Sequence, residues 1–491
     1  MLRTLIRQEL LTHLMSARFL AAVIITQLLI VTNTVVLIDV HKHRIADYNR
    51  QQRVHDQKIS ESETYSSLSL FIERPPNPMS LFSEGLDKQL GGTLEIYHGS
   101  VPMISDYTSE SLDNPYLQLF ASIDLIYIFQ VMLSLLALLF AYDAIAGDLE
   151  KGTLRLVISH PVGRGSILLA KYVGALGSLM LPVLISLLMV LLLLSMSGSI
   201  ELSGDDFLRI GGIVLTTVIY LSAFYLMGLL ISTLNRRSST SLMFCMFLWV
   251  FLVLIYPNWS RFAIDPVGDM RSEKLSVNQQ LNQIWEEVDR TERQFLANSP
   301  LRGQPPTFNL NLSESEVSSA GGRHQTNCKL REESEHLVPH VQNFNKVIGT
   351  LQVRLAEKSG VVREQRLAAG DIKQAIWDER LMKLSPASLY RFTTSAWAGT
   401  DLKGMLDFIE AARGYRRSTL DYFYDKNAFG SREWFAADRQ TADWWDLPRF
   451  KFQRVPALEN VTRALPGTCV LVLINVVLFM GAFLWFLKIE V

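Results

Sequence analysis

Six apolar runs constrain this chain more than any other feature of its sequence. A helix needs about 20 apolar residues to cross a hydrocarbon core of about 30 Å. Backbone N–H and C=O groups find no water in that core, so each run must satisfy them internally as a helix. The runs are residues 19–40, 119–142, 167–196, 210–234, 241–256 and 467–487, of which the fifth is the shortest. We therefore predict an all-α membrane protein with six transmembrane helices.

The polar part of the chain is also large. Two inserts, residues 41–118 and 257–466, hold more than half of the 491 residues. The chain has 47 Lys and Arg residues against 48 Asp and Glu residues, a formal net charge of −1. Nucleic-acid binding requires a concentrated basic surface, so we expect no nucleic-acid partner. The protein is expected to lie partly in the lipid bilayer and partly in water.

The Lys and Arg residues of the short flanks predict the orientation, because cytoplasmic loops carry an excess of them. They occur before the first run, between the second and third runs, between the fourth and fifth, and after the last; the loop between the third and fourth runs is acidic. Both termini are therefore expected in the cytoplasm. The predicted divisions are an N-terminal helix and first span (1–40), a first extracytoplasmic insert (41–118), a four-span block (119–256) with a cytoplasmic loop (143–166), a helical extracytoplasmic domain (257–466), and a last span with a cytoplasmic tail (467–491).

Helical periodicity is clear at the N-terminus and in the second insert. Residues 1–16 are amphipathic, with Leu2, Leu5, Ile6, Leu10 and Leu14 at helical spacing, which fits either an interfacial helix on the bilayer or a plain helical lead-in. The second insert has two apolar seams with steps of three and four residues, which predict helical hairpins. A third helix is expected over residues 371–383, before Pro386. The seams are Val277, Leu281, Ile284, Val288 and Phe295, and Leu337, Val341, Phe344, Ile348, Leu351 and Leu355.

The first insert is less regular. Residues 73–79 read ERPPNPM, and such a proline cluster is expected to exclude regular structure and to hold an extended backbone.

The charged loop between the second and third runs carries the most specific pattern. It contains Glu150-Lys151-Gly152-Thr153-Leu154, with Asp148 before this stretch and Pro161 and Arg164 after it. An ordinary interfacial turn is one interpretation. The pattern also resembles the cytoplasmic loop of type-2 ABC exporter permeases, and residues 76–80, 385–388 and 398–400 resemble segments of family members with large external loops.

This resemblance implies that the loop is a coupling helix that docks into a cytoplasmic ABC ATPase. The implied coupling residues are Asp148, Glu150, Gly152, Thr153, Leu154, Pro161 and Arg164. It further implies a second permease subunit, identical or homologous, and a place in the bacterial inner membrane. We expect Leu149, Leu154 and Val157 to form a small apolar plug, Glu150 to be free to meet a cation of the ATPase, and Thr153 to cap the following helix.

Four polar residues lie in or near the apolar runs, where a polar group needs a partner. Gln27, Gln130 and Asn475 lie inside the first, second and sixth runs, and Asp124 lies near the start of the second. Hydrogen bonds between helices are one explanation for the amides, and a translocation path through these four residues is the other. Asp124 is expected to face water at the external mouth.

The sequence contains no G-x-x-x-x-G-K-[ST] motif, so it lacks the backbone cradle and lysine that hold nucleotide phosphates. We therefore expect a transport subunit that is not itself an enzyme, that binds no cofactor, and that relies on ATP bound by its partner. The predicted function is the permease subunit of a bacterial ABC exporter. The alternative is an ATPase-driven membrane scaffold whose external domain acts on an envelope or periplasmic protein without transport.

Overall fold

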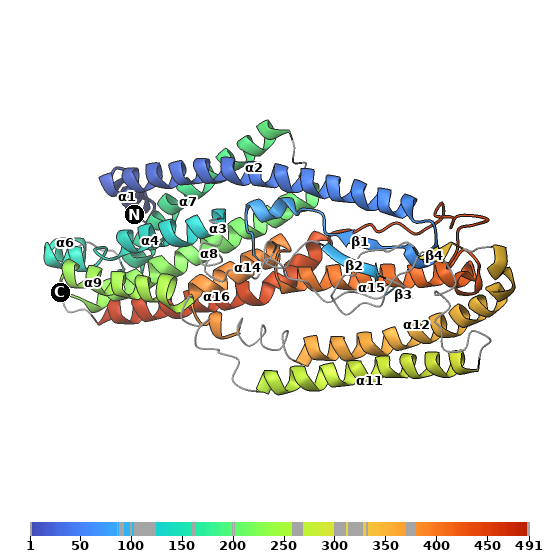
Figure 1. Cartoon of the computed structure of the whole chain (residues 1–491). Helices are drawn as coiled ribbons and strands as arrows, with labels where there is room; N and C mark the ends of the chain where they lie inside the picture. Colours follow the sequence, from blue (N-terminus) through green and yellow to red (C-terminus); the bar gives the residue numbers. More distant parts are fainter. Residues whose placement is uncertain are drawn as a thin grey trace.

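Six helical segments among the described residues are long and apolar enough to cross a membrane, in agreement with the predicted number (Figure 1). In this computed structural model the described residues are 2–85, 87, 93–98, 101–102, 124–158, 163–198, 200, 202–257, 269–298, 311–312, 328–329, 332–369 and 380–488. The six segments are α2 (Ala17–Glu61), Leu125–Glu150, α7 (Arg164–Ser197), α8 (Gly204–Leu234), Ser238–Ile255 and α16 (Ala457–Leu487). Helix α2 continues well past the predicted end of the first span.

Two of the spans contain a π-helical turn. The second consists of α3 (Leu125–Ile128), π-helical η5 (Phe129–Leu133), α4 (Ser134–Ala141) and α5 (Ala146–Glu150), and the fifth of α9 (Ser238–Trp249) and π-helical η6 (Val250–Ile255). A π turn changes the usual backbone bonding of a helix, and side chains from other helices bond to carbonyls in both turns. The Tyr220 hydroxyl donates to the Gln130 carbonyl at 2.9 Å, and the Ser385 hydroxyl donates to the Leu252 carbonyl at 2.7 Å.

A further helix, α14 (Pro386–Ala398), is buried between the spans. It begins where proline is favoured, at the first helical position after the Ser385 cap. Its Tyr390 ring stacks on Tyr220 of α8 with 4.2 Å between ring centroids. Glycines on both neighbouring helices let it approach: a Cβ on Gly212 of α8 would lie 2.3 Å from Trp397, and one on Gly467 of α16 would lie 2.1 Å from Thr393. The predicted helix 371–383 lies mostly outside the described residues.

Most of the remaining elements form a second body, here called the distal body, which lies beyond one end of the spans (Figure 1). It has its own cores, centred on side chains such as Leu68, Phe423 and Trp434 and on the α11–α12 contact. Its helices are α11 (Asp269–Ala297), α12 (Val338–Ala369) and α15 (Leu402–Asp425), with short turns η1 (Tyr65–Ser67), η7 (Glu332–Leu337) and η8 (Ala428–Gly430). A further turn, η2 (Pro78–Leu81), packs into the core of the spans through Met79 and Leu81.

The two predicted seams meet along α11 and α12, which lie side by side (Figure 1). Val288 of α11 and Phe344, Ile348 and Leu355 of α12 are buried in one cluster, so the hairpin prediction is confirmed for these positions. Val341 is buried in the neighbouring core instead. The side chains of Val277 and Leu281 lie outside the described residues.

The all-α prediction is wrong in one detail, because the distal body contains antiparallel sheets. Strands β1 (Leu70–Glu73), β2 (Thr93–His98) and β3 (Val101–Pro102) form a sheet in that order, and β4 (Asn311–Leu312) pairs with β5 (Cys328–Lys329). The prediction that residues 73–79 exclude regular structure is also wrong at its edges. Glu73 ends β1, and Pro78 begins η2 after the Asn77 cap, because proline fits the first position of a helical turn.

A buried ionic junction joins the spans to the distal body. Asp206 near the start of α8 is fully buried and accepts from Arg209 at 3.0 Å and from Arg454 at 2.9 and 3.2 Å. Arg454 also donates to Asn77, whose amide donates to the Ala398 carbonyl at the end of α14. A buried carboxylate needs such paired and hydrogen-bonded surroundings. The junction therefore fixes α8, α14 and the chain before α16 to one another.

Candidate functional site

The charged segment between the second and third spans folds as two short helices, α5 and α6 (Thr153–Ile158). Gly152 joins them with φ +72°, a left-handed conformation that glycine adopts without strain. Helix α6 lies at the same end of the molecule as both chain termini (Figure 1). The predicted coupling residue Pro161 lies outside the described residues.

Lys171 of α7 is the centre of this site. Its side chain is 9% exposed, and its ammonium group lies 2.8 Å from Asp148 of α5 and 2.9 Å from Glu9 of the N-terminal helix α1 (Leu2–Leu14). The Thr153 hydroxyl also donates to Asp148, at 3.1 Å to its carboxylate and 3.2 Å to its carbonyl. One lysine therefore links the charged segment, the third span and the N-terminal helix.

Sequence reasoning used Lys171 as evidence for orientation and as the lysine that opens the third span in the family pattern, but did not predict its ion pairs. The available signal was its position, one turn inside a predicted apolar run, where a charge requires a partner. Neither Glu9 nor Asp148 could be identified as that partner, because the three residues lie on separate helices.

Glu150 makes a contact within the chain that the sequence did not predict. Its carboxylate accepts from the Ser238 backbone N–H at 3.0 Å and from the Ser238 hydroxyl at 2.6 Å. It thus satisfies an otherwise unpaired N–H at the start of α9 and places negative charge at the helix N-terminus. Both bonds use the same carboxylate oxygen and Glu150 remains exposed, so its contact with the ATPase stays a prediction.

The predicted apolar plug is also wrong at Leu154. This side chain is 1% exposed and belongs to the core of the span bundle. Leu156 is instead 68% exposed, and Lys151 and Thr153 are exposed with it. The outer surface of the segment therefore combines an apolar side chain with polar ones.

Further bonds attach the segment to other spans. The Ser232 hydroxyl of α8 accepts from the backbone N–H groups of Ile145 and Ala146, each at 3.0 Å. Arg164, at the start of α7, donates to the Leu487 carbonyl of α16 at 2.8 Å. Cations are favourable at helix C-termini, so Arg164 holds the beginning of the third span against the end of the sixth.

The four residues of the predicted translocation path lie on three spans, because Asp124 caps the second span and Gln130 lies within it. No hydrogen bond between described residues joins any two of the four. Gln27 of α2 donates to the Pro182 carbonyl at 3.1 Å and to the Ser186 hydroxyl at 2.8 Å. Asn475 of α16 donates to the Ile219 carbonyl of α8 at 3.0 Å. These two amides form the interhelical bonds expected for buried polar side chains.

The other two path residues are more deeply enclosed. Asp124 is 1% exposed and caps α3 by accepting from the Tyr127 N–H, so the prediction that it faces water is wrong in this structure. The side-chain oxygen of Gln130 is buried without a hydrogen-bond partner among the described residues. The side-chain oxygen of Gln27 is likewise buried without a hydrogen-bond partner among the described residues.

Comparison with known proteins shows the family of this chain. Residues 3–402 match the family model of ABC-2 family transporter proteins. Over 43 residues the chain is 58% identical to the probable ABC transporter permease protein NosY of Stutzerimonas stutzeri and 54% identical to NosY of Pseudomonas aeruginosa. Each of these matches covers 9% of this chain and only 16% of the relative. Because the family model covers most of the sequence, this six-span chain belongs to the ABC-2 family of transporter proteins.

Proposed function

We propose that this protein is the permease subunit of a bacterial ABC exporter and that separate cytoplasmic ATPases drive it through residues 143–166. The observation that carries the proposal is that one part of this segment is exposed and another part is bonded to the spans. Its tip is exposed at Lys151 and Leu156, whereas its base is bonded to other helices through Lys171, Ser232 and Ser238. Such a segment can receive a push from outside and pass it to several spans.

The proposed mechanism follows these bonds. ATPase closure displaces α5 and α6, and the Asp148–Lys171 pair moves α7 and α1 with them. The Glu150 contact carries the same displacement to the start of α9, and the Ser232 contact carries it to α8. Packed helices respond to such a displacement by rigid-body tilting rather than by continuous deformation. Tilting of these spans opens an outward route for the substrate.

The test replaces the exposed apolar residue of the tip. Leu156→Asp should abolish co-purification of the ATPase and its stimulation, while the permease remains folded, because an apolar docking contact tolerates no unpaired carboxylate. Val54→Asp is the matched control, since Val54 is 44% exposed on the far part of α2. Normal ATPase binding by Leu156→Asp would contradict the coupling role of this segment.

The proposed orientation places both termini and α6 in the cytoplasm of the bacterial inner membrane, with the distal body on the outer side. The chain has three native cysteines, which are first replaced. In spheroplasts, a cysteine at Trp445, which is 94% exposed in the distal body, should react with an impermeant thiol reagent, and one at Lys151 should not. The reverse labelling pattern would invert the topology.

The proposed partners include a second permease subunit, identical or homologous. In the most apolar 18-residue stretches of α2, Ser238–Ile255 and α16, only 22%, 22% and 17% of the residues are buried within the chain. The corresponding share in α8 is 72%. Apolar helix faces of this size require lipid or another apolar helix as a neighbour. We propose that the second subunit covers part of this surface and that the bilayer covers the rest.

The alternative function, an ATPase-driven scaffold that acts on an envelope protein, is favoured by one observation. The Asp206–Arg454 junction ties the distal body firmly to α8, as force transmission to an external partner would require. Arg454→Ala should then leave ATP hydrolysis intact but abolish the envelope phenotype of the system. An unchanged envelope phenotype would favour transport over actuation.

A further inference from the structure

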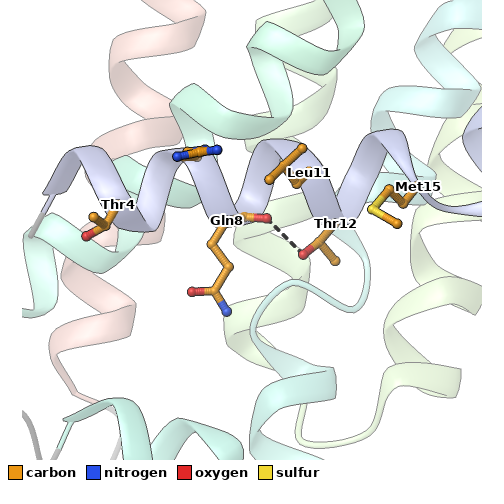
Figure 2. A pocket seen from close by; sticks show the side chains of 6 residues that line it. Thr4, Gln8, Leu11, Thr12 and Met15 are labelled. Atoms are coloured by element: carbon orange, nitrogen blue, oxygen red, sulfur yellow. Dashed lines mark hydrogen bonds between the residues drawn. The ribbon is translucent and has the colours of Figure 1, made fainter.

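The outer face of α1 carries a groove that the proposed coupling mechanism does not use. The groove has a volume of about 330 Å³ and is lined by Thr4, Arg7, Gln8, Leu11, Thr12 and Met15 (Figure 2). The opposite face of α1 packs on α7, where a Cβ on Gly174 would lie 2.8 Å from the Cβ of Glu9. The two faces of the helix therefore have different neighbours and different chemistry.

Charge is segregated between these two faces. Glu9 is the single acidic residue of α1, and it is turned inward to Lys171 at 2.9 Å. Arg3 and Arg7 lie on the exposed face, and neither forms an ion pair with a described residue. The outer face is consequently cationic, with no carboxylate of its own helix to neutralise it.

The apolar part of the groove continues the surface of the first span. Leu11 is 44% exposed and Met15 is 84% exposed, and the chain then enters α2 through the Ser16 cap. The first turns of α2 expose Leu20 by 60% and Ile24 by 57%. These α2 side chains face lipid if α2 is a span, so the groove lies at the edge of the lipid-facing surface.

We propose that this groove binds an anionic phospholipid, with the phosphate at Arg7 and the upper acyl chain on Leu11 and Met15. The combination of a cation, apolar side chains and continuity with a span matches a lipid whose charged and apolar parts are adjacent. On the opposite face, the Leu10 side chain of the predicted apolar stripe lies against α7, where a Cβ on Gly177 would be 3.1 Å from its Cδ1. The inference goes beyond the proposed coupling function and requires only that α2 spans the membrane.

The test measures lipid retained by the purified full-length chain. Native mass spectrometry after detergent washing compares phosphatidylglycerol with phosphatidylcholine as the added lipid. The wild-type chain should retain phosphatidylglycerol preferentially, and Arg7→Gln should reduce this retention about fivefold, the effect of one basic side chain near an anionic lipid surface. Arg7→Lys should retain most of the preference.

The matched control is Arg3→Gln, which removes the same charge from the same exposed face but outside the groove lining. Equal losses for Arg3→Gln and Arg7→Gln would indicate diffuse electrostatic attraction and overturn the proposed site. No preference of the wild-type chain for phosphatidylglycerol would also overturn it. If Arg7→Gln released the ATPase while phosphatidylglycerol retention stayed unchanged, the groove would be a protein-docking surface and the lipid proposal would be wrong.

Discussion

Replacement of Lys171 by methionine tests how the charged segment is held. Methionine keeps much of the length of the side chain but removes the ammonium group that lies between Glu9 and Asp148. The two carboxylates then lose their common partner and face each other across the same position. We expect the variant to insert normally but to hold α1 and α5 loosely against α7.

The expected loss of folding stability follows from the burial of the ion pairs. Removal of one partner from a buried ion pair costs about 3–5 kcal/mol. The side chains of Glu9 and Asp148 are 25% and 31% exposed, so water reduces the penalty, and we expect about 2–4 kcal/mol. Lys151→Met should have a much smaller effect on stability, because Lys151 is exposed and forms no ion pair among the described residues.

The assay compares thermal unfolding in detergent and ATPase stimulation for wild type, Lys171→Met and a rescue variant. The rescue adds Glu9→Gln and Asp148→Asn, which remove the uncompensated charges. Lys171→Met should lower the unfolding temperature and the stimulation, and the rescue should recover much of the stability. A Lys171→Met protein as stable as wild type, or a rescue variant no better than Lys171→Met, would refute the argument that Lys171 holds these helices by charge.

Three further predictions concern single contacts. Glu150→Gln should loosen the start of α9 less than Glu150→Ala, because the amide oxygen still accepts a backbone hydrogen bond; limited proteolysis at residue 238 measures this. Burial raises the pKa of the Glu73 carboxyl to about 7 from 4.5. The contribution of Glu73 to folding stability is therefore complete below about pH 4.5 and is lost as the pH rises through 7. Glu73→Gln should remove about 3 kcal/mol of this pH dependence in unfolding experiments between pH 5 and 8. Gly467→Ala should cost about 1–3 kcal/mol by forcing Thr393 away, whereas Gly481→Ala, with its nearest neighbour at 3.6 Å, should be tolerated in the same thermal assay.

Sequence alone was sufficient for the number of spans and for the helical hairpin. Apolar runs of membrane-spanning length have few alternatives to helix, because the bilayer core provides no hydrogen-bond partner. The seam containing Phe344 and Ile348 was equally informative, since a repeat of three and four residues places its members on one helix face. The small sheet was missed because its strands are short, and their pairing depends on residues far apart in the chain.

In the charged segment, too, some features could be predicted from the sequence and others could not. Its position between two spans, its glycine and its charges were all evident from the sequence, and so was the family resemblance.

Only the tertiary structure decided which of these side chains point inward. Leu154 is buried and Leu156 exposed, Glu150 accepts from Ser238, and Lys171 meets Glu9, which is 162 residues away in the chain. These contacts depend on how each helix is rotated about its axis and where it crosses its neighbours. The spacing of apolar residues specifies a helix face, but only packing against other helices determines which partner that face meets.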